Sequence, residues 1–425
     1  MKKSKIFVQI ASYRDPELLP TIKDCIAKAK YPKNLVFSIA WQHSPDDKWD
    51  DLSEYKNDKR FRILDISYLK SEGVCWARHQ LQQNYQDEEY TLQLDSHHRF
   101  VEDWDVELIA MYKDLQSKGY KKPLLTGYIP SYDPDNDPGA RIHIPWKMSF
   151  DRFSPEGVIH TLPESIDNFK ELDTPVLGRF YSAHFAFTCG KFVLEVPHDP
   201  NYYFHGEEHS ISARAYTCGY DLFHPHKVLI WHEYTRRDKK KQWDDVTTWG
   251  ARNERSFKRN RQLFEMDGEV RTEEFGKYDF GKVRSLADYE KFSGISFKRR
   301  SVQQWTLDHK DPPNPIFEGE EYEKSFVSMF RHCVDVGYDL VPEKDYEYWV
   351  VAFHRDNTPG GDPAEDTTLY RKDADINEIN GFFQDPDKYC KIWRQFETTY
   401  KPAYWVVWPY SKSKGWCERI TGKIG

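Results

Sequence analysis

Two repeating patterns of apolar residues organise the first 130 residues of the chain. Short runs rich in Ile, Val, Phe and Leu predict β-strands at residues 5–12, 35–41, 61–66, 90–94 and 123–128. Between these runs, apolar residues recur at helical spacing and predict helices at residues 17–30, from residue 73 onward and at 102–118. Such strand–helix alternation is typical of an α/β fold built on a mostly parallel sheet.

The pattern changes between residues 131 and 173, where Pro and Asp are frequent and periodicity fades. A long irregular region inside a compact domain is usually functional. We interpret it as an acceptor-side loop that covers a site, with a solvent-exposed insertion as the alternative. Regular patterns then return, and they predict a strand at 178–188, a helix from Glu207 to Gly219, a strand at 228–231 and a helix with a basic face at 249–264.

The last quarter of the chain is β-patterned. A Pro-rich junction at residues 311–315 precedes strand-like runs at 346–354 and 404–410. We therefore predict a catalytic domain followed by a small β-rich, sandwich-like accessory domain for docking or sheet-edge packing. The predicted bounds are 1–305 for the first domain, with a nucleotide-binding half at 1–130 and a second half at 131–305, and 306–425 for the accessory domain.

Composition and charge exclude several classes of protein. The 425 residues are 39% hydrophobic, which indicates a globular chain, and the formal net charge of −8 gives no general attraction to nucleic acid or to an anionic membrane. No segment approaches 18 apolar residues, so we predict no membrane span. The seven cysteines are scattered and include no Cys-x-x-Cys pair, which favours free thiols and a cytoplasmic location.

A polar cluster that contains Asp95 and His97 directly follows the predicted strand at 90–94. In an extended chain residues i and i+2 point the same way, so these two side chains can converge on one point. A carboxylate oxygen and an imidazole nitrogen suit a divalent ion of intermediate hardness, such as Mn²⁺. In open α/β sheets, ligands bind beyond the carboxyl ends of the strands. The alternative is that Asp95 only caps a turn.

Two later clusters add candidate groups. Glu207 and Glu208 lie at the predicted start of a helix. There they can take part in chemistry, or they can merely complement the helix dipole, which is worth about 0.3–1 kcal/mol. His232 ends the predicted strand at 228–231 and becomes a third metal ligand if that strand end lies near Asp95.

Five segments form a specific set when they are taken in order: IFVQIASYRDPEL, GVCWARHQL, LQLDSHHRF, GEEHSISARAYTCGYDLFHP and WHEYTR, within about residues 5–265. As a set they resemble the polypeptide N-acetylglucosaminyltransferase family. Members of that family modify hydroxyproline of a cytoplasmic ubiquitin-ligase adaptor or mucin-type threonine in protozoa. The last third of the chain has no counterpart in this resemblance.

The resemblance implies a GT-A fold, a UDP-sugar donor, a divalent metal (Mn²⁺ or Mg²⁺) and retention of the anomeric configuration. It implies that Asp95 and His97 bind the metal and that His232 completes the coordination. It also implies that Glu207 and Glu208 face the donor sugar and the attacking hydroxyl. The residues that it implies for donor binding are Arg14, Asp15, Arg78, Asp95 and Ser96.

Sugar-transfer chemistry agrees with these roles. A UDP-sugar breaks its anomeric bond only if the charge that builds on the leaving UDP is neutralised, and a metal ion and arginine side chains neutralise such charge. Retention without an obvious nucleophile favours front-face attack, in which Glu207 or Glu208 stabilises the reacting centre. A covalent route through one of these two carboxylates is the alternative.

The sequence therefore predicts an enzyme that transfers GlcNAc from UDP-GlcNAc to a polypeptide hydroxyl on hydroxyproline, threonine or serine. A GT-A transferase that extends a glycan or polysaccharide is the second interpretation. A catalytically inactive sugar-binding protein is the third. The choice of donor sugar depends on pocket shape, which residue spacing does not reveal.

Overall fold

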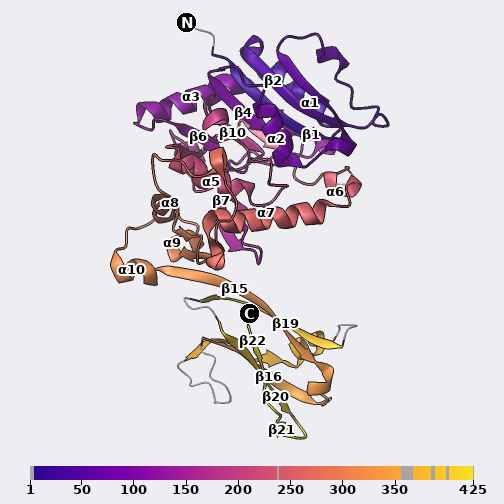
Figure 1. Cartoon of the computed structure of the whole chain (residues 1–425), viewed down its shortest axis with the longest axis vertical. Helices are drawn as coiled ribbons and strands as arrows, with labels where there is room; N and C mark the ends of the chain where they lie inside the picture. The colour runs from indigo at the N-terminus through magenta and orange to yellow at the C-terminus, as the bar shows by residue number, and fades with distance from the viewer. Residues whose placement is uncertain (1–3, 237–238, 356–366, 384–387, 399–401, 425) are drawn as a thin grey trace. The chain divides into compact units, whose positions relative to one another are not determined.

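The computed structural model describes residues 4–236, 239–355, 367–383, 388–398 and 402–424 of the chain. The chain divides into two compact units, residues 1–316 and 317–425, and the division directly follows the Pro-rich junction (Figure 1).

A mixed sheet of eight strands forms the centre of the first unit, in the order β3-β2-β1-β4-β10-β6-β11-β9 among the described residues. Neighbouring strands from β3 to β4 are parallel, whereas β10 runs antiparallel between β4 and β6. The mostly parallel α/β sheet predicted from the sequence is confirmed. Its strands are β1 (Ile6–Tyr13), β2 (Leu35–His43), β3 (Phe61–Ser67), β4 (Tyr90–Leu94), β6 (Pro123–Thr126), β9 (Val176–Leu177), β10 (Phe185–Cys189) and β11 (Asp221–His224).

Helices cover both faces of this sheet because its strands are apolar on both sides. Leu35, Phe37 and Ile39 of β2 share a buried cluster with residues of α1 and α3, whereas Ala40 packs with Ala77 of α2 on the opposite face. Figure 1 shows these three helices around the sheet. Their bounds are α1 (Leu18–Lys28), α2 (Val74–Gln82) and α3 (Trp104–Ser117).

A second core lies beside the sheet in the same unit, where Met148, Phe150 and Phe264 are buried together. The prediction of an irregular region at 131–173 is wrong in part, since β7 and β8 form an antiparallel hairpin there. Interleaved polar residues and a register shift after Phe150 obscure its period in the sequence. The unit also contains β7 (Trp146–Phe153), β8 (Ile159–Ser165), α4 (Phe192–Glu195), α5 (Glu207–Thr217), α6 (Gln242–Asp245), α7 (Trp249–Phe264), α8 (Leu286–Ser293), β13 (Ile295–Ser296), β14 (Ser301–Gln303) and α9 (Gln304–Leu307).

The strand predicted at 178–188 is correct only at its end, because β10 begins at Phe185. The apolar run that follows it forms the short helix α4. One further pairing decides where the candidate residues meet. β5 (His98–Phe100) pairs antiparallel with β12 (Ile230–His232), and His232 lies opposite His98.

The second unit is a β-structure with its own core, as predicted. β15 (Phe326–Gly337) pairs antiparallel with β19 (Tyr389–Thr398), and a second antiparallel sheet centres on β16 and β20. Trp349 and Val351 of β16 are fully buried between them. Two short helices, α10 (Gly319–Lys324) and α11 (Ile376–Phe382), were not predicted. The second sheet contains β16 (Tyr346–His354), β17 (Thr368–Arg371), β18 (Ala374–Asp375), β20 (Tyr404–Ser411), β21 (Gly415–Trp416) and β22 (Ile420–Lys423).

The central sheet makes a stability prediction. Phe187 of β10 is fully buried, and its ring lies 5.4 Å from that of Tyr90. Replacing Phe187 with alanine removes these contacts and leaves a cavity, so we expect the free energy of unfolding to fall by about 3–5 kcal/mol in urea denaturation. Leu194→Ala is the control, because Leu194 is 64% exposed. Equal losses in the two variants would contradict the placement of Phe187 in the core.

Candidate active site

Asp95, His97 and His232 meet at the carboxyl end of β4. The chain turns back after β4 to form β5, and the pairing of β5 with β12 brings His232 beside Asp95. The Oδ2 atom of Asp95 lies 3.5 Å from Nε2 of His232 and 3.9 Å from Nε2 of His97. Among the described residues, this is the group of potential metal ligands whose donor atoms all lie within 4.8 Å of one another.

Two of these side chains are held in the protonation state that binds a metal. Burial lowers the pKa of His232 to about 3, so its imidazole is neutral at neutral pH. Burial alone raises the pKa of Asp95, but the Arg78 guanidinium and His232 lower it well below the usual value. A neutral imidazole and an ionised carboxylate are the ligand forms of these groups.

The residues present fit a divalent cation. Both ring nitrogens of His232 are buried, and neither has a hydrogen-bond partner among the described residues. A buried polar atom without a partner is costly unless a ligand satisfies it. One carboxylate and two imidazoles form a donor set that suits Mn²⁺ and other ions of intermediate hardness.

A second layer of polar groups orients the first. The Asp15 carboxylate is fully buried, with its Oδ2 atom 2.7 Å from Nδ1 of His97, and it accepts a hydrogen bond of 2.7 Å from the Ser96 hydroxyl. His98 accepts the backbone N–H of Asp95 at 3.2 Å through its Nε2 atom. Carboxylate–histidine pairs of this kind fix the ring orientation of a metal ligand and raise its basicity.

Asp15 therefore gives a prediction on metal affinity. In Asp15→Asn the partner of His97 loses its charge, and we expect the affinity for Mn²⁺ to fall by about 10–100-fold, as it does for comparable outer-shell partners. Isothermal titration of Mn²⁺ measures this change. Asp105→Asn is a matched control, because Asp105 is also buried and accepts two backbone hydrogen bonds, from Lys30 and Tyr31. An affinity that does not change in Asp15→Asn would contradict the orienting role.

Arg78 and Glu207 form a buried ion pair behind the metal-ligand group. Arg78 donates from Nη2 to Asp95 Oδ1 at 2.7 Å and from Nη1 to Glu207. The other oxygen of Glu207 accepts the Cys75 thiol at 2.6 Å and lies 3.4 Å from Nδ1 of His198. Both carboxylate oxygens of Glu207 are thus engaged within the protein.

Glu208, the next residue, has a different environment. It is only partly buried, and its Oε1 atom accepts the backbone N–H of Ala183 at 2.9 Å. Burial raises the pKa of Glu208 to about 7, even though the Ala183 N–H lowers it. A carboxyl group with this pKa changes its charge near neutral pH, which is the range that acid–base chemistry requires.

Arg14 belongs to a separate acidic cluster. Its Nε atom lies 2.7 Å from Asp47 Oδ2, its Nη1 atom lies 3.0 Å from Asp245 Oδ2, and its guanidinium lies over the ring of Tyr68. Of the predicted site residues, Arg14 is therefore the one that the structure holds apart from the Asp95 group.

Two cavities meet at Arg78 and Asp95. The small cavity, of about 120 Å³, extends from these two residues toward Tyr13, and the basic residues Arg236 and Lys241 also line it. The large cavity, of about 790 Å³, extends in the other direction and is lined by Glu207, Glu208 and His232, among others. Its volume lies within the range of small-molecule sites, about 300–1,000 Å³. The candidate metal ligands therefore lie where the small cavity, which is lined by basic residues, meets the large cavity.

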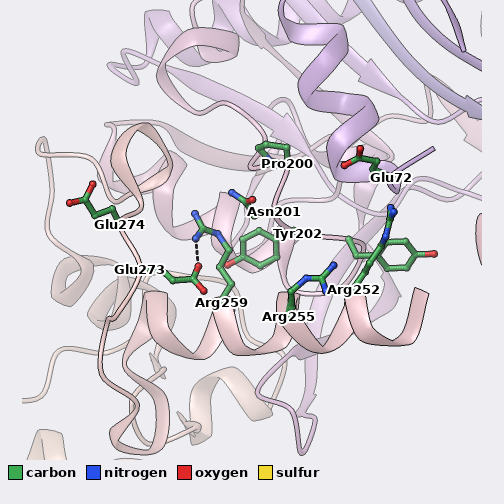
Figure 2. Close-up of a pocket in the computed structure, with 10 residues that line it drawn as sticks. Glu72, Pro200, Asn201, Tyr202, Arg252, Arg255, Arg259, Glu273 and Glu274 are labelled. Atoms are coloured by element: carbon green, nitrogen blue, oxygen red, sulfur yellow. Dashed lines mark hydrogen bonds and ion pairs between the residues drawn. The ribbon is translucent and has the colours of Figure 1, made fainter. Parts of the chain in front are cut away.

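A third cavity, of about 490 Å³, lies along the basic face of α7 (Figure 2). It is lined by equal numbers of basic and acidic side chains: Arg252, Arg255, Arg259, Glu72, Glu273 and Glu274. Figure 2 shows Arg259 turned toward Glu273, and their charged atoms lie 2.7 Å apart. Because the charges balance, this cavity offers no net attraction for an anion.

The sequence also matches a known family. Residues 5–58 and 50–299 match the family described as Glycosyltransferase (GlcNAc), which is more than half of the chain. The chain belongs to this family. Membership and the mixed sheet together confirm the predicted GT-A fold, and the chain is a glycosyltransferase.

Similarity of this glycosyltransferase to other proteins is remote. No curated protein matches it. GalNAc-T7, solved with UDP, GalNAc and Mn²⁺, is 16% identical, with a TM-score of 0.45, over 62% of this chain and 48% of that chain, so the match spans about half of GalNAc-T7. TarS from S. aureus, solved with UDP, is 11% identical, with a TM-score of 0.37, over 64% of this chain and 68% of its own. The mannosyltransferase PcManGT from Pyrobaculum calidifontis, solved with GDP-Man and Mn²⁺, is 11% identical, with a TM-score of 0.35, over 55% and 58%.

Sequence reasoning missed His184 and Tyr234 at the site of this glycosyltransferase. The His184 ring centroid lies 4.4 Å from that of His232, its Nδ1 atom lies 2.8 Å from the Ser182 hydroxyl, and its Nε2 atom lies 3.2 Å from the Tyr234 hydroxyl. A lone histidine before an apolar strand was the signal for His184.

No helix in the described part of the chain is long and apolar enough to cross a membrane.

Proposed function

We propose that this glycosyltransferase transfers GlcNAc from UDP-GlcNAc to a polypeptide hydroxyl on hydroxyproline, threonine or serine, with a divalent cation and with retention. The observation that supports this best is the convergence of Asp95, His97 and His232 between a basic cavity and a larger one, in a chain of the GlcNAc glycosyltransferase family.

The small cavity is proposed as the site of the donor nucleotide. A divalent cation held by Asp95, His97 and His232, Mn²⁺ or Mg²⁺, would neutralise the charge that builds on the leaving diphosphate. Arg236 and Lys241 line this cavity and would bind phosphate oxygens through charge-assisted hydrogen bonds. Ser96 also lines it. We assign to Asp15 the orientation of His97, and to Arg14 the joining of the two segments that carry Asp47 and Asp245.

The two adjacent glutamates are proposed to have different roles. Glu207 holds Arg78, which in turn holds Asp95, so Glu207 is a positioning residue. Glu208 lines the large cavity, and the hydrogen bonds that it accepts from described residues all go to its Oε1 atom, so its Oε2 atom would orient the attacking hydroxyl. In the transfer step the acceptor oxygen bonds to the anomeric carbon while the bond to UDP breaks and its electron pair leaves with UDP. The acceptor proton passes to the leaving phosphate oxygen. The engaged oxygens of Glu207 argue against a covalent route through that residue.

The domain roles extend this proposal. Residues 1–130 would bind the nucleotide, residues 131–305 would bind the donor sugar and the acceptor, and residues 306–425 would serve as a docking domain. We also propose a cytoplasmic location, which the scattered cysteines of the sequence favour.

Release of UDP tests the proposed function. The purified chain is incubated with Mn²⁺ and, in turn, UDP-GlcNAc, UDP-GalNAc, UDP-glucose and UDP-galactose, with and without peptides that contain threonine, serine or hydroxyproline. We expect peptide-dependent UDP release that is greatest with UDP-GlcNAc and that stops on chelation. Release that ignores the peptides but responds to added glycans would indicate a glycan-extending enzyme. No release from any donor would indicate a sugar-binding protein.

A further inference from the structure

One wall of the large cavity is formed by β8 and the residue before it. Val158, Ile159, His160, Thr161 and Pro163 all line the cavity. Successive side chains of a strand point to opposite faces of its sheet. Because side chains from both faces of β8 line this cavity, the cavity runs along the edge of the strand, where the backbone is accessible, and not across one face.

The edge of β8 that does not face β7 has no strand partner among the described residues. The hairpin of β7 and β8 is a two-stranded sheet, and β7 is the only strand that pairs with β8 in the described part of the chain. A free strand edge presents a row of backbone N–H and C=O groups, which is a template for pairing with another extended chain. Pro163 of β8 has no N–H to donate, which fits a strand at a sheet edge and leaves the row of donors on this edge to the residues before it.

A continuous series of contacts leads from β8 to the candidate metal ligands. The Thr161 hydroxyl donates to the Tyr128 hydroxyl at 2.9 Å. The Tyr128 ring lies 5.5 Å from the ring of His184, which lies 4.4 Å from the ring of His232. The free edge thus belongs to the same cavity as Glu208, and a chain bound along it passes close to the reacting groups.

We propose that the acceptor polypeptide binds in an extended conformation as an added strand on the free edge of β8, with its hydroxyl residue directed toward Glu208. This inference rests on the proposed function and specifies how its acceptor is held. A polypeptide matches the edge better than a glycan does, because only a polypeptide repeats N–H and C=O groups at the spacing of a strand. Backbone pairing would supply affinity with little demand on acceptor sequence, and cavity side chains such as His160 would select the residues beside the hydroxyl.

Backbone methylation of the acceptor tests this inference. Ten-residue peptides with one central threonine are screened for UDP release with UDP-GlcNAc and Mn²⁺, and the best peptide is resynthesised with one N-methyl amide at each position in turn. In an added strand, alternate N–H groups face β8 and the others face away. We expect the KM for the peptide to rise about 3- to 10-fold at every second position flanking the threonine, the cost of one lost hydrogen bond, and to change little between them.

The controls separate this inference from the proposed function. UDP release in the absence of peptide does not involve β8, so its rate should be the same in every assay. Because only the peptide is modified, a change in KM cannot come from misfolding of the enzyme. A uniform rise, no rise, or transfer to glycans but to no peptide would overturn the added-strand inference while transferase activity stands. If no UDP is released from any donor, the proposed function fails and this inference fails with it.

Discussion

Replacing His232 with alanine is expected to lower kcat/KM for sugar transfer on the order of 10²–10³-fold, the usual loss when one group that stabilises transition-state charge is removed. His232 supplies one of three candidate metal ligands and is 6% exposed, so water replaces its nitrogen only poorly. The remaining pair, Asp95 and His97, retains too few donor atoms to hold a divalent ion firmly. Initial rates of UDP release at a series of Mn²⁺ concentrations measure the loss.

A matched control accompanies this variant. His226 is 3% exposed, and its Nδ1 atom also has no hydrogen-bond partner in the described part of the chain, yet it lies outside both cavities that meet at Asp95. His226→Ala should therefore match His232→Ala in its effect on stability and leave the rate of transfer almost unchanged. Equal losses of activity in the two variants would show that His232 acts through folding and not through a ligand.

Replacing Glu208 with glutamine is expected to lower kcat on the order of 10²-fold, the usual cost when a reacting group is no longer held in the productive orientation. Since the pKa of Glu208 is about 7, the carboxyl group is neutral below that pH and ionised above it. The wild-type rate should therefore rise with pH through about 7, because the ionised carboxylate accepts the hydrogen bond of the attacking hydroxyl more strongly than the neutral acid does. Glutamine does not titrate, so the variant should lose this rise.

Glu290→Gln is the control for Glu208→Gln. Glu290 of α8 is also partly buried, burial raises its pKa as well, and it accepts one backbone N–H, from Phe297 at 2.9 Å. Its carboxyl group lies away from both cavities at Asp95. A wild-type pH profile that persists in Glu208→Gln would assign the titration to another group and would remove Glu208 from the reaction.

Local sequence patterns predicted the elements of the central sheet well. β2 and β3 begin where their apolar runs place them, and β2 is buried almost throughout. The helix α7 also begins where it was predicted, although most of its buried residues are polar. The hairpin of β7 and β8 was not predicted, since the buried residues Met148 and Phe150 of β7 alternate with polar ones and β8 is largely polar. Its stability comes from tertiary packing, which single-strand patterns do not encode.

The candidate site could be predicted only in part, because it also depends on contacts between segments that are distant in the sequence. The convergence of Asp95 and His97 follows from local geometry, whereas the approach of His232 depends on the pairing of β5 with β12, two strands separated by about 130 residues of sequence. The unequal environments of Glu207 and Glu208 were also beyond local reasoning. Arg78 and Cys75 engage Glu207 through α2, an element far from both glutamates in the sequence.

Binding of Mn²⁺ tests the central claim most directly, because it needs neither the donor sugar nor the acceptor. Electron paramagnetic resonance of free Mn²⁺, titrated against the chain in the presence of UDP, counts the ions that are bound. The account predicts one ion per chain in the wild type and in His226→Ala, and loss of that ion in Asp95→Ala and in His232→Ala. One tightly bound ion that remains in both site variants would contradict it.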